Sequence, residues 1–130
     1  KLMINQLWFS HLVATAEVLS IGSAAGVDLG VLRDSLIASP ANSNFVEHDV
    51  LSILHHGDYD EGFAIALACK DLGLSIDLAR SVGMPAEVSS LVEQVFRRAR
   101  ASYGDRAGEM TPFKLYEDLL GRPLRLDPAA

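Results

Sequence analysis

The feature that most constrains the fold of this chain is the helical spacing of its apolar residues, which persists along almost its whole length. In the first 25 residues, apolar side chains recur three and four positions apart, as they do along one side of an α-helix. No segment alternates apolar and polar residues with the period of two that is typical of a half-buried strand. We therefore expect an all-α helical bundle with two long helices and several shorter ones.

Capping residues and helix breakers divide the chain into six expected helices. Gly26 and Gly83 should end the two long ones, because glycine readily adopts the left-handed conformation that follows many helices. Asp28 should cap the second helix, and Pro85 should open the fifth, because proline fits a first helical turn. The expected helices cover residues 1–25, 28–39, 42–54, 63–82, 85–104 and 111–120.

A single domain should account for most of the chain. Its 130 residues suit one apolar core, and 49% hydrophobic with 22% charged residues is typical of a globular protein. We predict a helical domain over residues 1–121 and an extended tail over residues 122–130, which contains two prolines. Because Lys1 already lies inside a helical pattern, we expect a preceding segment that this sequence does not include.

Composition argues against several classes of partner. A net charge of −6 is unsuited to nucleic acid, whose binding requires a basic surface. No apolar run reaches the ~20 residues of a membrane span, and the first residues lack the layout of a signal peptide. Cys69 is the only cysteine, so no internal disulfide can form, which fits a reducing cytoplasm. We expect no nucleic-acid or membrane partner and a cytoplasmic location.

Three further polar features have simpler explanations than catalysis. His55 and His56 are adjacent, so they do not share a helix face, and we predict no metal site. Cys69 should be a small buried helix residue rather than an activated thiol. Glu17 interrupts an apolar stretch, so it either faces solvent or lies hydrogen-bonded at an interface, and we favour the interface.

Two short motifs are better candidates for chemistry. Lys1 and Asn5 are four residues apart, which places an ammonium and an amide on one helix face, about 6 Å apart along the axis. The second motif is Lys70-Asp-Leu-Gly-Leu-Ser-Ile-Asp77. Its Gly73 costs roughly 1 kcal/mol in a helix, so a neighbouring helix or a ligand should require its small size. Each motif could also be a set of ordinary surface residues.

Taken together, the two motifs resemble the β-hydroxyacid dehydrogenase family, which includes 3-hydroxyisobutyrate dehydrogenase and tartronate semialdehyde reductase. The resemblance rests on Lys-x-x-x-Asn opening one long helix and Phe-x6-Lys-Asp-Leu-Gly-Leu-x-x-Asp opening another. It also includes Gly26-Val-Asp28, Gly83-Met-Pro85 and Gly108-Glu-Met-Thr111, and so covers essentially the whole chain. It implies a bundle like the C-terminal domain of 6-phosphogluconate dehydrogenase.

The resemblance also implies roles for individual residues. Lys1 would be the catalytic general acid and base at the substrate hydroxyl, and Asn5 would bind the substrate. Lys70 and Asp77 would belong to the cofactor-binding element. A Rossmann domain outside this chain would hold NAD or NADP, while the helical domain closes over the nicotinamide and forms a homodimer or higher homo-oligomer. The substrate would be a small hydroxy acid, similar to 3-hydroxyisobutyrate, converted to its semialdehyde or the reverse.

The chemistry of lysine suits this role only in a special setting. A free lysine has a pKa near ~10.4 and is a poor base at neutral pH. Burial and the positive charge of an oxidised nicotinamide would both favour the neutral amine. Because the chain lacks a strand followed by Gly-x-Gly-x-x-Gly, we expect it to be inactive alone.

Two departures from the family pattern and two other functions remain open. Many relatives carry two adjacent asparagines after the lysine, whereas here Ile4 precedes Asn5, and Ser75 stands in place of the usual alanine. Imine reductases share the fold, but Lys1 argues against that activity. The alternative from another class is a non-catalytic helical dimerisation module.

Overall fold

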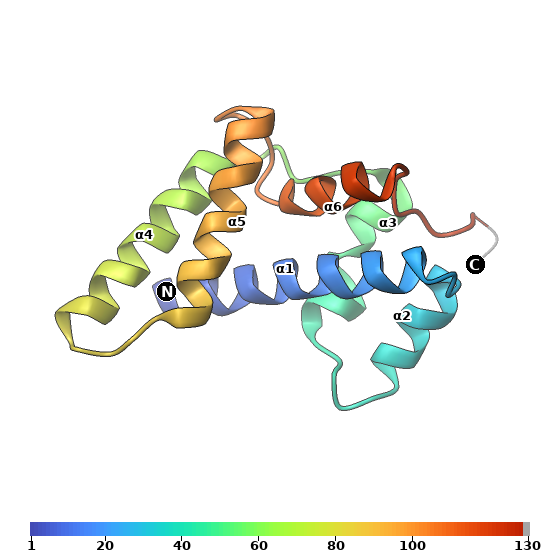
Figure 1. The fold of residues 1–130 in the computed structure, drawn as a ribbon, viewed down its shortest axis with the longest axis horizontal. Helices are drawn as coiled ribbons and strands as arrows, with labels where there is room; N and C mark the ends of the chain where they lie inside the picture. Colours follow the sequence, from blue (N-terminus) through green and yellow to red (C-terminus); the bar gives the residue numbers. More distant parts are fainter. Residues whose placement is uncertain (129–130) are drawn as a thin grey trace.

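The computed structural model describes residues 1–128, and all regular elements within that range are helical (Figure 1). They are α1 (Leu2–Ala24), α2 (Leu29–Ile37), η1 (Phe45–Asp49), α3 (Leu51–His56), α4 (Ile65–Ser81), α5 (Glu87–Tyr103) and α6 (Pro112–Leu120). The η1 segment is a π-helix. An isolated antiparallel bridge joins Ala64 to Gly108. The all-α prediction is confirmed.

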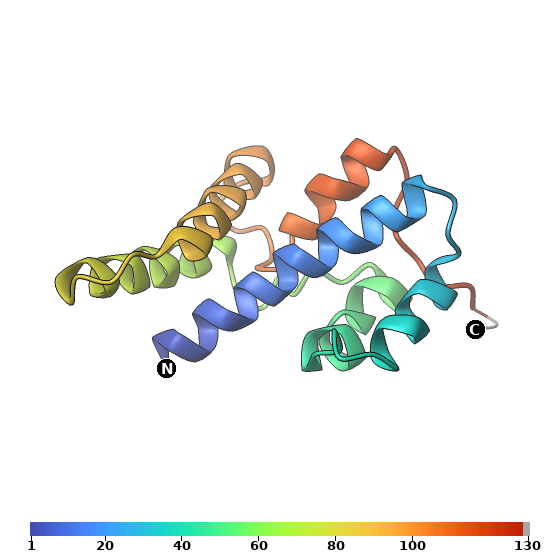
Figure 2. The same ribbon diagram turned by 60° about the horizontal axis from the view of Figure 1, so that its bottom comes forward.

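Helix α1 is the centre of the fold, because α2, η1, α4, α5 and α6 all pack against it. The α4 and α5 helices form a pair beside its N-terminal half, whereas α6 lies along its C-terminal half (Figures 1 and 2). The α2 and α3 helices lie at the other end of the molecule from the α4–α5 pair (Figure 1). The side of α1 that faces these elements is buried and contributes Phe9, Leu12, Val13, Ala16 and Leu19 to the core.

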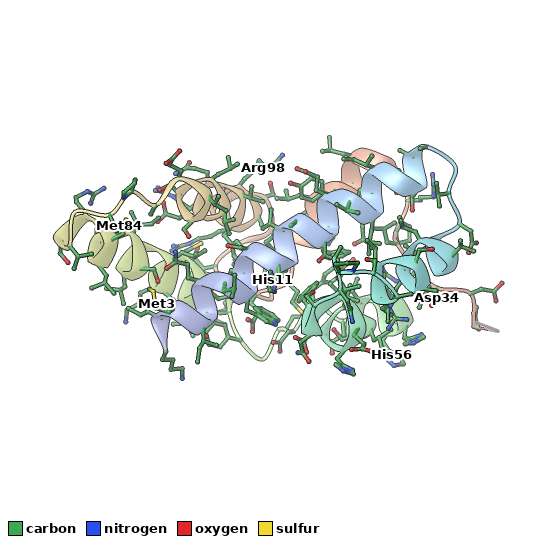
Figure 3. All side chains as sticks on the ribbon, turned by 90° about the horizontal axis from the view of Figure 1, so that it is seen from below. Met3, His11, Asp34, His56, Met84 and Arg98 are labelled. Carbon is green, nitrogen blue, oxygen red and sulfur yellow. The ribbon has the colours of Figure 1, made fainter. Side chains whose placement is uncertain are left out.

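The opposite side of α1 is apolar as well, but it is exposed. Figure 3 shows α1 crossing the molecule at the front, with His11 on the side toward the viewer. Exposed apolar residues on this side include Leu7 and Ile21, at 59% and 62%. Despite this composition, none of the helices within residues 1–128 has the length and hydropathy needed to cross a bilayer.

Several of the predicted helix ends are confirmed. Gly26 has a φ of +89° and follows the end of α1, where residues with a side chain are strained. Gly83 follows α4 with a φ of +71°. The side chain of Asp28 accepts a hydrogen bond from the backbone N–H of Val31 at 3.1 Å, which is the expected cap of α2.

The predicted starts of the two later long helices are wrong by two residues each. Helix α5 begins at Glu87, so Pro85 lies before the first helical turn rather than in it. Helix α4 begins at Ile65 because the backbone before it pairs with another segment. The N–H of Glu109 donates to the carbonyl of Phe63 at 2.9 Å, so Phe63 lies before α4 and outside the helix that carries Lys70 and Asp77.

The predicted third helix is divided in two. The N–H of Val50 donates to the carbonyl of Phe45 at 2.9 Å, which is the five-residue spacing of a π-helix. The π-helical turn contains one more residue than an α-helical turn, which rotates the side chains that follow it about the helix axis. Ile53 and Leu54 of α3 face the core and are buried. The predicted start at residue 42 or 43 is also too early, because the helical segment begins at residue 45. The Ser43 hydroxyl lies before it and accepts a hydrogen bond from the Val46 N–H.

The segment after α6 is non-helical and packs onto the helical bundle. Leu124 is buried, and the N–H of Leu126 donates to the carbonyl of Leu54 at 2.9 Å. Arg122 donates from Nη2 to the carbonyl of Ser23 at 3.1 Å. These contacts join residues 122–126 to the ends of α1 and α3. Residues 129 and 130 of the predicted tail lie outside the described residues.

Candidate functional site

The candidate site lies where the first turn of α1 meets the middle of α4. The side-chain amide of Asn5 donates from Nδ2 to Oδ2 of Asp71 at 3.1 Å. A second link, 3.5 Å long, runs from the Ser75 hydroxyl to the carbonyl of Leu2. The two motifs that stand out in the sequence, separated by more than 60 residues, are therefore in direct contact.

The two lysines of these motifs are both exposed. Lys1 precedes the first turn of α1, and its carbonyl accepts the N–H of Asn5 at 3.1 Å. Lys70 lies on α4, next to the residue that holds Asn5. The described residues do not bury the Lys1 ammonium, so this chain alone does not provide the burial expected of a lysine that acts as a base.

Asp77 is not brought to the same place. It is exposed and pairs with Arg80 on its own helix, where Nη1 and Oδ1 are 3.2 Å apart. Two helical turns separate it from Lys70, roughly 10 Å along the axis. The carboxylate that reaches Asn5 is instead that of Asp71, which belongs to the Lys70–Asp77 motif but is not among the predicted site residues.

Packing of another helix does not explain the glycine of the α4 motif. A Cβ atom at Gly73 would lie 3.6 Å from Oε2 of Glu93 on α5, which is ordinary van der Waals contact. Alanine would therefore fit here, and close approach of a helix, one of the two expected reasons for Gly73, is not observed.

The carboxyl group of Glu109 lies among several carboxylates, one of which is Asp71 of the Asn5–Asp71 pair. Burial raises the pKa of Glu109 to about 8, and the effect is increased by a hydrogen bond with Asp60 and by the charges of Asp60, Asp49 and Asp71. Glu109 is held in place by its N–H, which donates to the carbonyl before α4. At neutral pH this carboxyl keeps its proton and acts as a hydrogen-bond donor among carboxylates.

The site continues along α1 into a small polar hollow. Trp8 follows Asn5 by three residues and Lys1 by seven, so all three project from one side of the helix. The indole of Trp8 donates from Nε1 to Oδ2 of Asp49 at 2.7 Å, and Asn44 donates to the same oxygen at 3.1 Å. The hollow has a volume of about 260 Å³ and is lined by Trp8, Asp49, Ser52, Asp58, Asp60 and Met110.

None of the motifs in the sequence predicts this part of the site, and Trp8, Asp58 and Asp60 are not among the predicted site residues. The seven-residue spacing from Lys1 to Trp8 was the available signal. The carboxylates opposite Trp8 come from segments more than 40 residues away, and no sequence pattern links them.

These groups can perform proton transfer and hold a small polar molecule. An ammonium can donate a proton, and its neutral form can accept one. The amide of Asn5 has a second N–H and a carbonyl oxygen in addition to the N–H bound to Asp71. The hollow beside Trp8 adds acceptor oxygens suited to hydroxyl groups.

Comparison with known proteins shows that this chain is similar to part of several dehydrogenases. Residues 1–116 match the family model described as NAD-binding of NADP-dependent 3-hydroxyisobutyrate dehydrogenase. The chain is 38% identical over 98 residues to L-threonate dehydrogenase of Cupriavidus necator, covering 75% of this chain and 33% of that protein. It is 31% identical over 103 residues to mitochondrial 3-hydroxyisobutyrate dehydrogenase of Mus musculus, covering 75% of this chain and 31% of that protein.

A solved structure agrees with these sequence matches. The fold is similar to that of 3-hydroxyisobutyrate dehydrogenase from Salmonella typhimurium, with a TM-score of 0.78 and 26% identity. That match covers 88% of this chain and 40% of the other. The chain thus spans between about a third and two fifths of the length of the proteins it matches.

Proposed function

This chain belongs to the 3-hydroxyisobutyrate dehydrogenase family, and we propose that its residues 1–121 form the substrate-binding and dimerisation domain of an NAD(P)-dependent β-hydroxyacid dehydrogenase. The reaction is hydride transfer between the hydroxyl-bearing carbon of a small hydroxy acid and the nicotinamide, which gives a semialdehyde in the oxidative direction. The observation that carries the proposal is the Asn5–Asp71 hydrogen bond, which holds the two family motifs together. The chain alone is expected to be inactive.

The residues of this chain fit one end of a dinucleotide. Lys70 immediately precedes Asp71 on α4 and its side chain is exposed, so its ammonium would be free to face the nicotinamide end of the bound cofactor. When bound, the cofactor supplies or accepts the hydride. The phosphates require a strand–turn–helix, which residues 1–128 do not contain, so the Rossmann domain outside this chain would hold them. Asp77, paired with Arg80, would have an orienting or structural role.

Lys1 would transfer the proton. In oxidation its neutral amine accepts the proton of the substrate hydroxyl, while the carbon that bears this hydroxyl gives its hydride to the nicotinamide. In reduction its ammonium donates the proton to the carbonyl oxygen. Because Lys1 is exposed in this chain, closure of the Rossmann domain over α1 would supply the burial that favours the neutral amine.

Asn5 and Asp71 would set the position of the substrate. Asp71 fixes one N–H of the Asn5 amide, and the remaining N–H and carbonyl oxygen can bind the substrate. Asp71 is then a positioning residue. Asp71→Ala should lower kcat/KM by roughly tenfold to a hundredfold, because this is the factor that corresponds to loss of one hydrogen bond to a charged group. Asp71→Asn should recover part of that loss.

The polar hollow beside Trp8 supports a hydroxylated substrate. Carboxylates of Asp49 and Asp60 line it and can accept bonds from hydroxyl groups beyond the reacting carbon. A relative carries the name L-threonate dehydrogenase, and L-threonate is such a compound. Both L-threonate and 3-hydroxyisobutyrate therefore belong in the substrate panel.

The proposal is tested with the full-length enzyme, a panel of β-hydroxy acids, and both NAD and NADP. Lys1→Ala should lower kcat by about 10²- to 10⁴-fold, as expected for loss of a general acid and base, while cofactor affinity stays within twofold. Lys114→Ala, which changes an exposed lysine on α6, serves as the control. Turnover that survives Lys1→Ala contradicts the catalytic role.

A different outcome would favour the second function. If no hydroxy acid is turned over and neither NAD(H) nor NADP(H) raises the melting temperature, a non-catalytic helical dimerisation module is the better description. Turnover of a cyclic imine in place of a hydroxy acid would assign an imine reductase.

We further propose that the enzyme self-associates as a homodimer or higher homo-oligomer in the cytoplasm. The exposed apolar side of α1 supports self-association. The cytoplasmic location is supported by the single cysteine, Cys69, because one cysteine allows no internal disulfide and such chains are typical of a reducing compartment. Size-exclusion chromatography with light scattering tests the first point, and fractionation of cells tests the second.

A further inference from the structure

Two hollows of the molecule meet at Trp8. Its indole lines the polar hollow of about 260 Å³ described above, and it also lines a larger hollow of about 570 Å³. The larger hollow opens on the side of α1 that carries His11 (Figure 3). Its opposite wall comes from α2 and the loop that follows, through Leu36, Pro40, Ala41, Asn42 and Asn44. Among the residues described as lining the two hollows, Trp8 is common to both.

Trp8 lies between the candidate site and the larger hollow along α1. Lys1 and Asn5 precede Trp8 in the helix, whereas the other α1 residues that line the larger hollow follow it. A molecule that is held at Lys1 and Asn5 and extends along α1 therefore meets the indole before it reaches the larger hollow.

Contacts on several sides hold the indole in this position. Its Nε1 donates to Oδ2 of Asp49 at 2.7 Å, and Nδ2 of Asn44 donates to the same oxygen at 3.1 Å. The rings of Phe9 and Phe45 lie edge-on to it, with centroids 5.6 and 5.4 Å from that of the indole. Aromatic pairs favour this arrangement. The indole and Asp49 thus form a fixed wall between the two hollows.

We propose that Trp8 determines the length of the substrate, because its indole stops the end of the substrate that is distal to the reacting carbon. This proposal rests on the proposed function, since it requires a hydroxy acid held at Lys1 and Asn5. In the parent enzyme the distal group ends in the polar hollow. Without the indole, the same group enters the larger hollow, and longer hydroxy acids become substrates.

The volumes indicate the length at which this limit applies. A water molecule occupies about 30 Å³ in the liquid, so a hollow of about 260 Å³ holds roughly nine non-hydrogen atoms. A longer substituent requires the larger hollow. That hollow is suited to an alkyl end, because Ala14, Val18 and Leu36 are among the residues that line it.

The test uses the full-length enzyme and 3-hydroxypropanoates that carry a methyl, butyl or decyl group on C2. In the parent, kcat/KM for the decyl acid should be at least 100-fold below that for the methyl acid. Trp8→Ala should raise kcat/KM for the decyl acid at least tenfold, because even one methylene in a pocket can be worth tenfold. The methyl group does not reach the indole, so kcat/KM for the methyl acid should change by less than threefold.

Two further variants separate loss of the wall from other effects of the substitution. Trp8→Phe keeps an aromatic ring but no N–H, and it should still exclude the decyl acid, because Asn44 continues to donate to Asp49. Ala14→Phe fills the larger hollow, so W8A/A14F should lose the gain for the decyl acid. Circular dichroism checks the fold of each variant. If Trp8→Ala does not fold, Trp8→Leu removes part of the wall and should give a smaller gain of the same kind.

Leu7→Ala is the matched control. It also shortens a large side chain of α1, next to Trp8 in the sequence, but Leu7 is 59% exposed and lines neither hollow. The ratio of kcat/KM for the decyl and methyl acids should stay the same in this variant. A gain for the decyl acid in Leu7→Ala would assign the effect to a loosened α1 and overturn the role of Trp8.

The remaining outcomes also decide between the two proposals. A parent that is active on the methyl acid supports the proposed function, and an unchanged length profile in Trp8→Ala then overturns the role of Trp8 alone. A gain that W8A/A14F retains excludes the path into the larger hollow. A parent that turns over no hydroxy acid contradicts the proposed function, and the role of Trp8 fails with it.

Discussion

Two glutamates only eight residues apart lie in opposite environments. Glu117 on α6 is 4% exposed and accepts hydrogen bonds from the Tyr59 hydroxyl, from the Leu124 N–H at 2.6 Å and from Arg125 at 2.7 Å. Glu109, before α6, is half-buried and faces only carboxylates among the groups that shift its pKa. Glu117 therefore has the guanidinium of Arg125 beside it, whereas no cation is among the groups that shift the pKa of Glu109.

The difference shows how partners decide the state of a buried carboxyl group. A carboxylate that is removed from water is tolerated when a cation and several donors surround it, and otherwise it keeps its proton. Burial raises the pKa of Tyr59 to about 12, so its phenol remains a donor to Glu117 at physiological pH. The region around Glu109, next to the candidate site, should therefore respond to pH.

The largest expected effect comes from making the environment of Glu117 like that of Glu109. Arg125→Met removes the guanidinium and leaves a buried carboxylate without a cation, which should lower the free energy of unfolding by about 3 kcal/mol at pH 8. The loss should be smaller at pH 5, where the carboxyl can take up a proton. Urea unfolding at the two pH values measures both effects.

The matched control for this prediction is Arg80→Met. That residue also forms an ion pair, but its side chain is 76% exposed, so the free energy of unfolding should change by less than about 0.5 kcal/mol. Equal losses in the two variants would mean that burial does not distinguish the two pairs.

An intermediate effect is expected from Glu109→Gln. The pKa of Glu109 in the folded chain is about 8, above its ordinary value of 4.5. The proton is held more tightly in the folded state, so this stabilisation is complete below pH 4.5 and is lost as the pH rises through 8. Because the group is only half-buried, we expect a loss of about 1–2 kcal/mol between pH 5 and 8 in the parent. The free energy of unfolding of the Glu109→Gln variant should fall by less than that of the parent over this pH range.

Unfolding curves at several pH values compare the parent with Glu109→Gln. The relevant quantity is the difference between them, because other groups titrate in both. Parallel pH profiles would show that Glu109 does not hold its proton in the folded chain.

The smallest effect is expected at the exposed end of α4. Asp77→Ala breaks an ion pair whose carboxylate is 71% exposed, so stability should change by less than about 0.5 kcal/mol. If Asp77 takes part in cofactor binding, the Kd for NAD or NADP in the full-length enzyme should rise while stability stays the same. Isothermal titration measures the first quantity, and an unchanged Kd restricts Asp77 to its pair with Arg80.

The local features of the fold could be predicted from sequence because they depend on neighbouring residues. The existence of α1 and α4 follows from their apolar spacing, and the cap at Asp28 and the turn at Gly26 follow from the conformations that those residues favour. The start of α4 could not be predicted in the same way, since a backbone bond to Glu109, more than 40 residues away, decides where it begins.

The candidate site could be predicted in part for the same reason. Lys1 and Asn5 are one helical turn apart, so their shared face is a local property. The partner of Asn5 is 66 residues away, and the carboxylates around Glu109 come from three other segments. Only the three-dimensional packing of α1 against α4 brings them together.

The contacts made by residues 122–126 have a consequence for folding during synthesis. These residues leave the ribosome after every helix of the bundle, yet Leu124 completes the core and Arg125 supplies the cation for Glu117. Until they emerge, the nascent bundle carries an uncompensated carboxylate and an uncovered apolar site. The domain should therefore reach its final stability only once this segment is free, and chaperones should bind nascent chains that stop at Gly121 for longer than chains that extend past Leu126.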